Sequence, residues 1–159
     1  MSDSKEGSDK TYLANAAALL FVADRFKFLS EYMNKIRSKE DYVLVLDRYQ
    51  VSTQAYQTVQ GASALVLTEL RKMVPPPDVT FYLDTSVNAC LKRISQRNRK
   101  STYIDYVYEQ RRFLGKVDQE YRREIHLLSV IGEEVVVIDG EQSEEEISEQ
   151  IWGYVKDRI

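Results

Sequence analysis

A polar stretch at residues 47–57 holds the chain's densest group of side chains that could bind a ligand. It begins with Asp47 and Arg48 and includes a large aromatic residue, Tyr56. The apolar run before it, residues 42–46, is typical of a buried strand in a parallel sheet. Ligands of open α/β sheets bind outside the carboxyl ends of the strands. An acid, a base and an aromatic residue at that position therefore predict a binding site.

Helical and strand patterns alternate along the rest of the chain. We expect helices at residues 12–37, 52–73, 86–97, 104–130 and 143–159, and strands at residues 42–47, 79–83 and 134–138. Strands that alternate with helices indicate an α/β fold whose parallel sheet is flanked by helices. Residues 1–12 are expected to form a flexible polar leader, and residues 13–159 a single domain.

Several helix ends have local signals. Gly61 is expected to interrupt the helix at residues 52–73, which Val74–Pro77 then ends because proline cannot continue a helix. Ser86 is a candidate N-terminal cap. Ser143 and Glu146 have the spacing of a capping box at the start of the last helix.

The composition limits the classes of function. The chain has 159 residues, a net charge of −3, 43% hydrophobic and 30% charged residues. This balance is that of a soluble globular protein and gives no general attraction to nucleic acid or membrane. Cys90 is the single cysteine, which excludes a disulfide framework and favours a cytoplasmic location. No apolar run approaches the length of a membrane span.

Three segments occur in a characteristic order and spacing: Leu19–Arg25, Asp47–Gln57 and Pro77–Asp84, followed near the end by Val137–Asp139. With them, the chain resembles the thymidylate kinase family over residues 13–159. The resemblance implies a P-loop-kinase-like parallel sheet and the transfer of phosphate from ATP to dTMP, which gives dTDP. It also implies Mg²⁺ as cofactor, dTMP and ATP as small-molecule partners, and a homodimer.

The resemblance assigns base and sugar contacts to five residues. Phe21 would stack on thymine, and Arg25, one helical turn later, would bond a thymine carbonyl. Ser52 and Thr53 would contact the base, and Tyr56 would crowd the sugar 2′ position and so favour deoxyribose. Each assignment has an alternative: a core aromatic for Phe21, a solvated surface arginine for Arg25, and helix capping for the Ser52–Thr53 pair.

The resemblance places the reacting phosphate at the start of the same stretch. Arg48 would bind the dTMP phosphate, because a guanidinium group can bond two phosphate oxygens at once. Asp47 would lie near Mg²⁺ and the attacking oxygen, where it could hold metal-bound water or orient the acceptor. The alternative for Asp47 is a buried ion pair with its neighbour. Gln57 belongs to the motif, with either a binding or a structural role.

A basic segment is expected to act on the donor nucleotide. Positive charge over a transferring phosphoryl group stabilises the transition state. The resemblance implies a lid at about residues 97–105 that closes over ATP, with the catalytic arginine either in the lid or in a phosphate-binding loop. The candidates are Arg93, Arg97, Arg99 and Lys100, of which Arg97 and Arg99 would be catalytic. The alternative is a solvated charge run.

Acidic residues complete the expected donor side. Asp105 and Glu109 have i,i+4 spacing, so they would share one helix face, and they resemble the acidic residues that follow the lid. Asp139 would lie at the edge of the adenine pocket, where backbone contacts dominate.

One family feature has no counterpart among these residues. A loop of the form G-x-x-x-x-G-K-[ST] cradles ATP phosphates in such kinases, and residues 7–11 match it only weakly because the second glycine is missing. We therefore expect a sheet without the first strand–helix unit and the strand that follows it. Three explanations fit: a truncated or mis-started sequence, which we favour, two flanking strands that pair directly, or a strand supplied by a partner chain.

The sequence thus predicts a dTMP kinase whose activity could be impaired. The alternative is a catalytically inactive dTMP-binding or regulatory module derived from such a kinase. A kinase for another nucleoside monophosphate is a further alternative, against which Arg25, Tyr56 and the Ser52–Thr53 pair argue.

Overall fold

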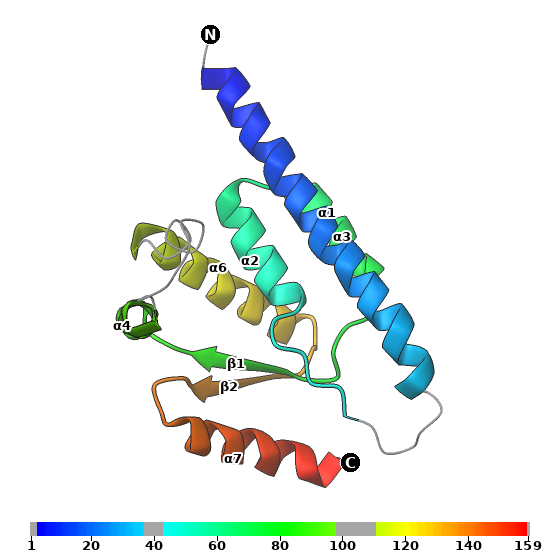
Figure 1. Cartoon of the computed structure of the whole chain (residues 1–159), viewed down its shortest axis with the longest axis vertical. Coiled ribbons are helices and arrows are strands. Elements are labelled where there is room, and N and C mark those ends of the chain that lie inside the picture. The colour runs from blue at the N-terminus through cyan, green and yellow to red at the C-terminus, as the bar shows by residue number, and fades with distance from the viewer. Residues whose placement is uncertain (1–2, 37–42, 98–110, 159) are drawn as a thin grey trace. The chain divides into compact units, whose positions relative to one another are not determined.

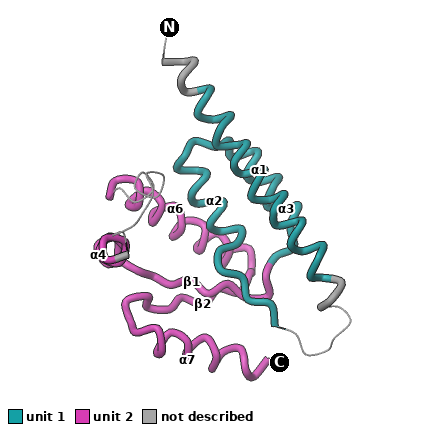
Figure 2. The backbone as a smooth tube through the Cα atoms, viewed as in Figure 1, with its two compact units in different colours: residues 1–76 teal, residues 77–159 magenta. Residues whose placement is uncertain are grey.

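The computed structural model describes residues 3–36, 43–97 and 111–158. In chain order its elements are α1 (Asp3–Ile36), α2 (Gln50–Gln60), α3 (Ala64–Met73), β1 (Thr80–Asp84), α4 (Val87–Arg97), α6 (Arg111–Val130), β2 (Val135–Asp139), α7 (Glu144–Val155) and the 3-10 helix η2 (Lys156–Arg158) (Figure 1). The chain divides into two compact units, Met1–Pro76 and Pro77–Ile159 (Figure 2). The fold is mixed α/β, as predicted, and most of it is helical.

The first unit consists of α1, α2 and α3, which contact one another. Its core joins α1 to α3 and to the residue after α3, through Ala18, Val22, Leu67, Leu70 and Val74. Ala18 is completely buried, and a residue this small lets a neighbouring helix approach closely. Burial of this apolar cluster holds α1 and α3 together.

The predicted interruption at Gly61 is confirmed. Gly61 has a φ of 94°, in the left-handed region that glycine adopts without a steric penalty. The amides of Gly61 and Ala62 donate to the carbonyls of Thr58 and Gln57, at 3.0 and 2.9 Å, which closes the end of α2. α3 ends at Met73, just before the proline run that was expected to stop it.

The second unit is built on β1 and β2, which pair in parallel from Thr80↔Val135 to Asp84↔Asp139. Both α6 and α7 contact β2, and in Figure 1 the two strands lie between these helices. The strands expected at residues 79–83 and 134–138 are confirmed to within one residue at each end.

Both predicted helix caps of this unit are present. The Ser143 hydroxyl accepts from the Glu146 amide at 3.2 Å, and the Glu146 carboxylate accepts from the Ser143 amide at 2.9 Å. These reciprocal bonds form the capping box of α7. The Ser86 hydroxyl likewise accepts from the Ala89 amide, at 3.2 Å, at the start of α4.

The strand predicted at residues 42–47 is wrong for the part that the structure describes. Residues 43–46 have no strand assignment, and Val43, Leu44, Val45 and Leu46 are 43%, 37%, 82% and 36% exposed. Apolar composition suits a segment to a strand, but a strand forms only where a neighbour completes its hydrogen bonds. Among the described residues, no strand pairs with this segment.

The helix expected from residue 12 begins earlier, at Asp3, so α1 covers most of the predicted leader. Extension of a helix that already exists adds hydrogen bonds without a new nucleation cost, which explains why polar residues can join it. Residues 98–110, with the predicted lid and the start of the following helix, lie outside the described residues. None of the described helices has the length and apolar character needed to span a membrane.

Candidate functional site

α1 and α2 bring Arg25 and Thr53 together in the first unit. Arg25 Nη2 donates to Thr53 Oγ1 at 3.2 Å, and Arg25 Cζ lies 4.5 Å from the centroid of the Tyr49 ring. The solvated surface arginine considered as an alternative is therefore not observed. The guanidinium group has several N–H donors, and its bond to Thr53 uses only one of them.

Burial shifts the pKa values of Arg25 and Tyr49. Desolvation lowers the pKa of Arg25, while the neighbouring Tyr49 ring and Asp24 act in the opposite direction. Burial also raises the pKa of Tyr49, and the nearby Arg25 charge opposes that rise. A half-buried cation over an aromatic face interacts more strongly than a fully solvated one, so the Arg25 guanidinium is held in a defined orientation.

Arg48 precedes α2 and adopts an unusual backbone conformation. Its φ is 64°, in the left-handed region that residues other than glycine seldom occupy. Its Cζ lies 5.4 Å from the centroid of the Tyr56 ring. Backbone strain of this kind is concentrated at functional sites, where the surrounding structure maintains it.

The two residues after Arg48 are bonded to the end of α3. Tyr49 Oη donates to the Pro75 carbonyl at 3.0 Å. Gln50 Nε2 donates to the carbonyls of Val74 and Pro75, at 3.1 and 3.0 Å. The sequence did not single out Tyr49 or Gln50. The one signal for them is their position inside the motif, beside Arg48.

The buried face of α2 is unusually polar. Gln50, Thr53, Gln54 and Gln57 recur at helical spacing, and all four are buried. Gln54 Nε2 donates to the Leu67 carbonyl at 2.9 Å, which ties α2 to α3. Gln57 is 2% exposed, and its Oε1 has no hydrogen-bond partner among the described residues. This burial favours a structural role for Gln57.

The structure excludes three of the alternative, non-binding roles considered for these residues. Phe21 is 53% exposed on α1, one turn before Arg25, so it is not a core aromatic. Asp47 is exposed and is therefore not part of a buried ion pair. Ser52 and Thr53 lie inside α2, after its N-cap residue Tyr49, so neither of them caps the helix.

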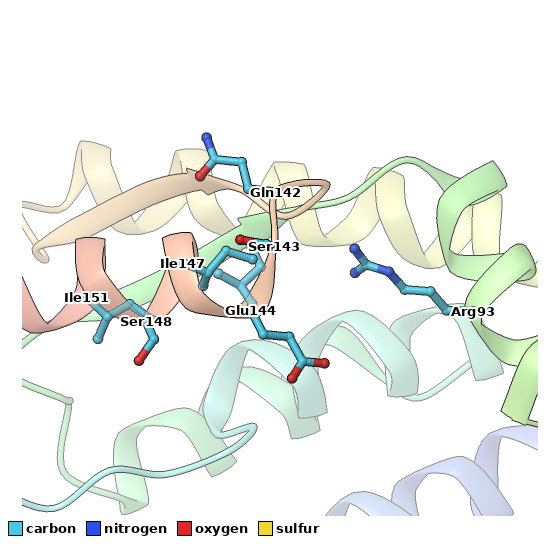
Figure 3. A pocket seen from close by; sticks show the side chains of 8 residues that line it. Arg93, Gln142, Ser143, Glu144, Ile147, Ser148 and Ile151 are labelled. Atoms are coloured by element: carbon cyan, nitrogen blue, oxygen red, sulfur yellow. The ribbon is translucent and has the colours of Figure 1, made fainter.

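In the second unit, Arg93 joins α4 to the end of β2. Its Nη2 donates to the Gly140 carbonyl at 2.8 Å. Asp139 Oδ1 accepts from the Glu141 amide at 2.9 Å, in the turn after β2. A pocket of about 570 Å³ lies beside these groups, and Figure 3 shows Arg93 and the start of α7 around it. Its lining residues are Leu83, Arg93, Gln142, Ser143, Glu144, Ile147, Ser148 and Ile151.

Gly140 allows the carboxyl ends of the two strands to meet. Its amide donates to the Asp84 carbonyl at 2.9 Å. A Cβ atom at this position would lie 2.0 Å from Thr85 Oγ1 and 3.2 Å from the Asp84 carbonyl oxygen. Only glycine fits here without a shift of its neighbours.

An ion-pair network that the sequence did not predict joins α6 to the end of β1. Arg122 bonds both carboxylate oxygens of Asp84, at 2.6 and 3.1 Å, and Asp118 at 3.2 Å. These bonds raise the pKa of Arg122. Because Asp84 and Asp118 are 38 and 4 residues away in the sequence, only the Asp118 pair has a local signal.

Several predicted donor-side residues cannot be placed. Arg99, Lys100, Asp105 and Glu109 lie outside the described residues, as does the side chain of Arg97, whose backbone ends α4. Within the described ranges, no three His, Cys, Asp or Glu side chains are grouped so that they could hold a metal ion.

Comparisons with known proteins agree on one family. The family model for thymidylate kinase matches residues 2–151. A "probable thymidylate kinase" of Pyrobaculum aerophilum is 34% identical over 141 residues, which are 87% of this chain and 67% of that protein. Another, of Pyrococcus abyssi, is 31% identical over 157 residues, 97% of this chain and 70% of that protein.

The match to a third relative is shorter. A "probable thymidylate kinase" of Methanococcus aeolicus is 32% identical over 104 residues. These residues make up 65% of this chain and 49% of that protein, so the chain spans about half the length of this relative. The family model nevertheless covers nearly all of this sequence. The chain belongs to the thymidylate kinase family.

Proposed function

We propose that the chain acts in the phosphorylation of dTMP to dTDP with ATP. The observation that carries this proposal is the joining of Arg25, Tyr49 and Thr53 across α1 and α2, with Arg48 beside them. The motifs that the sequence singled out for the acceptor nucleotide therefore converge in one unit. Family membership supports phosphotransferase chemistry at this site.

In this proposal, the first unit binds the acceptor. Phe21 offers an exposed aromatic face for the thymine ring. Arg25, oriented by Tyr49 and Thr53, donates to a thymine carbonyl. Ser52 adds a polar contact to the base, and Tyr56 restricts the space at the sugar 2′ position.

Arg48 would hold the dTMP phosphate. During the transfer, a phosphate oxygen of dTMP forms a bond to the γ-phosphorus of ATP, and the bond to the bridging oxygen breaks and releases ADP. Mg²⁺ would neutralise phosphate charge in that step. Such an ion is held mainly by phosphate oxygens and water and needs only one or two protein carboxylates. The exposed carboxylate of Asp47 could supply such a ligand.

The donor side is proposed from residues of the second unit. Arg93 lines the pocket and bonds Gly140, and Asp139, at the end of β2, would lie at the edge of the adenine site. The remaining donor-side candidates are Arg97, Arg99, Lys100, Asp105 and Glu109. We also propose that the parallel pairing of β1 and β2 is that of a P-loop-kinase-like sheet.

The test is an assay of ADP release by this chain with dTMP and Mg-ATP. We expect turnover that needs both nucleotides and falls about 100-fold or more in Arg48→Ala, because a donor aimed at developing charge is lost. Arg123→Ala is the control, since Arg123 is exposed and pairs with Glu120 on the same helix. Absence of turnover in the unaltered chain would contradict the proposed activity.

A catalytically inactive chain would give a different result. A dTMP-binding or regulatory module would bind dTMP in a calorimetric titration but release no ADP. Competition with dUMP, dCMP and dGMP separates both possibilities from a kinase for another nucleoside monophosphate.

A further inference from the structure

We propose that Tyr49 is a positioning residue that acts on both arginines of the acceptor site. Its ring orients Arg25, and its hydroxyl fixes the turn that carries Arg48. The inference rests on the proposed function, and it gives a role to a residue that the sequence left without one.

The Arg25 guanidinium lies over the ring of Tyr49. Arg25 Cζ is 4.5 Å from the ring centroid, a distance at which the cation is attracted to the aromatic face. The bond from Arg25 Nη2 to Thr53 Oγ1, at 3.2 Å, holds a second point of the group. Together, the two contacts determine where the other N–H donors point.

The hydroxyl of Tyr49 ties the start of α2 to a rigid segment. It donates to the Pro75 carbonyl at 3.0 Å. Pro75 is itself followed by prolines at positions 76 and 77, and a proline that precedes another proline has little conformational freedom, because its ring fixes φ and the next ring restricts ψ. Gln50 Nε2 donates to the same carbonyl at 3.0 Å, so two adjacent side chains share one anchor.

Arg48 lies directly before this anchored pair. Its left-handed φ of 64° is unfavourable for an arginine and persists only where surrounding contacts enforce it. The tether on Tyr49 is such a contact. Loss of the tether would release the Arg48 backbone and alter the position of a guanidinium proposed to hold phosphate.

A purely structural role for Tyr49 is the competing explanation, because its side chain also packs against the core cluster of the first unit. A structural defect would weaken the binding of every ligand alike. The two actions proposed here instead affect different parts of the nucleotide, the base through Arg25 and the phosphate through Arg48.

Calorimetric titrations with dTMP, thymidine and dCMP separate the two actions. In Tyr49→Phe the ring remains and the tether is lost, so dTMP affinity should fall about two- to tenfold while thymidine affinity stays unchanged, the range expected for one hydrogen bond. In Tyr49→Leu the ring is lost as well, so the preference for dTMP over dCMP should also fall, about three- to tenfold.

The control is Tyr154→Phe, which likewise keeps the ring and loses a hydroxyl, because the Tyr154 hydroxyl donates to Glu134 in the second unit. Thermal unfolding of each variant shows whether it is folded. If Tyr49→Leu does not fold, the titrations of Tyr49→Phe alone decide whether the inference holds. Equal losses for all three ligands, or no loss, would overturn the inference. If the unaltered chain does not bind dTMP, the proposed function itself fails, and that outcome is distinct from a failure of the Tyr49 role alone.

Discussion

At the scale of single residues, two arginines proposed to bind the acceptor each lie near a tyrosine ring, Arg25 by Tyr49 and Arg48 by Tyr56. The family resemblance singled out both arginines, Thr53 and Tyr56, because they occupy positions in its motifs. It did not single out Tyr49 or Gln50. The bonds of those two residues go to carbonyls about 25 positions away, and tertiary packing alone creates them.

Arg25→Lys should reduce the preference for dTMP over dCMP by about tenfold, because an ammonium group cannot stack flat on the ring and bond Thr53 at once. Paired calorimetric titrations with the two nucleotides measure this preference. Arg123→Lys, on the exposed face of α6, is the matched control. An unchanged preference in Arg25→Lys would mean that the planar group is not needed.

At the scale of elements, local signals predicted the helix ends well. Gly61, Ser86 and the Ser143–Glu146 pair each act within a few residues of their own position. The strand at residues 42–47 was wrong because a strand depends on a neighbour that its own sequence does not encode. Parallel pairing of β1 and β2 was predictable from the alternation of strands and helices.

Ser143→Ala should lower the free energy of unfolding by about 1 kcal/mol at neutral pH. The bonds from Ser143 hold the pKa of Glu146 below its usual value of 4.5. The part of this contribution that comes from the bonds of Ser143 to the Glu146 carboxylate is therefore present above pH 4.5 and is lost as the pH falls and Glu146 is protonated, while the bond from the Glu146 amide to the Ser143 hydroxyl remains. Urea unfolding followed by fluorescence of Trp152, the single tryptophan, measures it. Ser148→Ala is the control, and an effect of Ser143→Ala that is independent of pH would contradict the argument.

Gly140→Ala should destabilise the second unit by about 1–3 kcal/mol, the usual range for overpacking. Its new methyl group would collide with Thr85 Oγ1, 2.0 Å away. The double variant with Thr85→Ala should recover part of the loss, since the contact with the Asp84 carbonyl remains. The same fluorescence measurement applies, and Gly153→Ala, which meets no atom within 4 Å, is the control. Equal stability of the two glycine variants would contradict the proposed close approach.

At the scale of the whole molecule, α1 exposes a series of large apolar side chains. Tyr12, Leu13 and Leu20 are 71%, 75% and 71% exposed, and a large exposed apolar patch on a protein marks an interaction surface. The homodimer implied by the family resemblance stays a prediction, as does the single domain, and this patch is where we expect the dimer contact.

Sedimentation velocity should therefore show twice the mass of the chain. Leu20→Arg should shift the equilibrium toward monomer, because a charge would be buried at the contact. Lys27→Gln, on the same helix, should leave the mass unchanged. A monomer for the unaltered chain would contradict the dimer.

The claim on which the account depends is that the first unit binds dTMP through Arg48. The most direct measurement is a calorimetric titration of the chain with dTMP, beside the Arg48→Met variant, which keeps a long side chain without charge. We predict saturable binding with one site per chain and a loss of about tenfold or more in the variant, as expected when a charge-assisted phosphate contact is removed. Absence of binding, or equal binding by both proteins, would contradict the account.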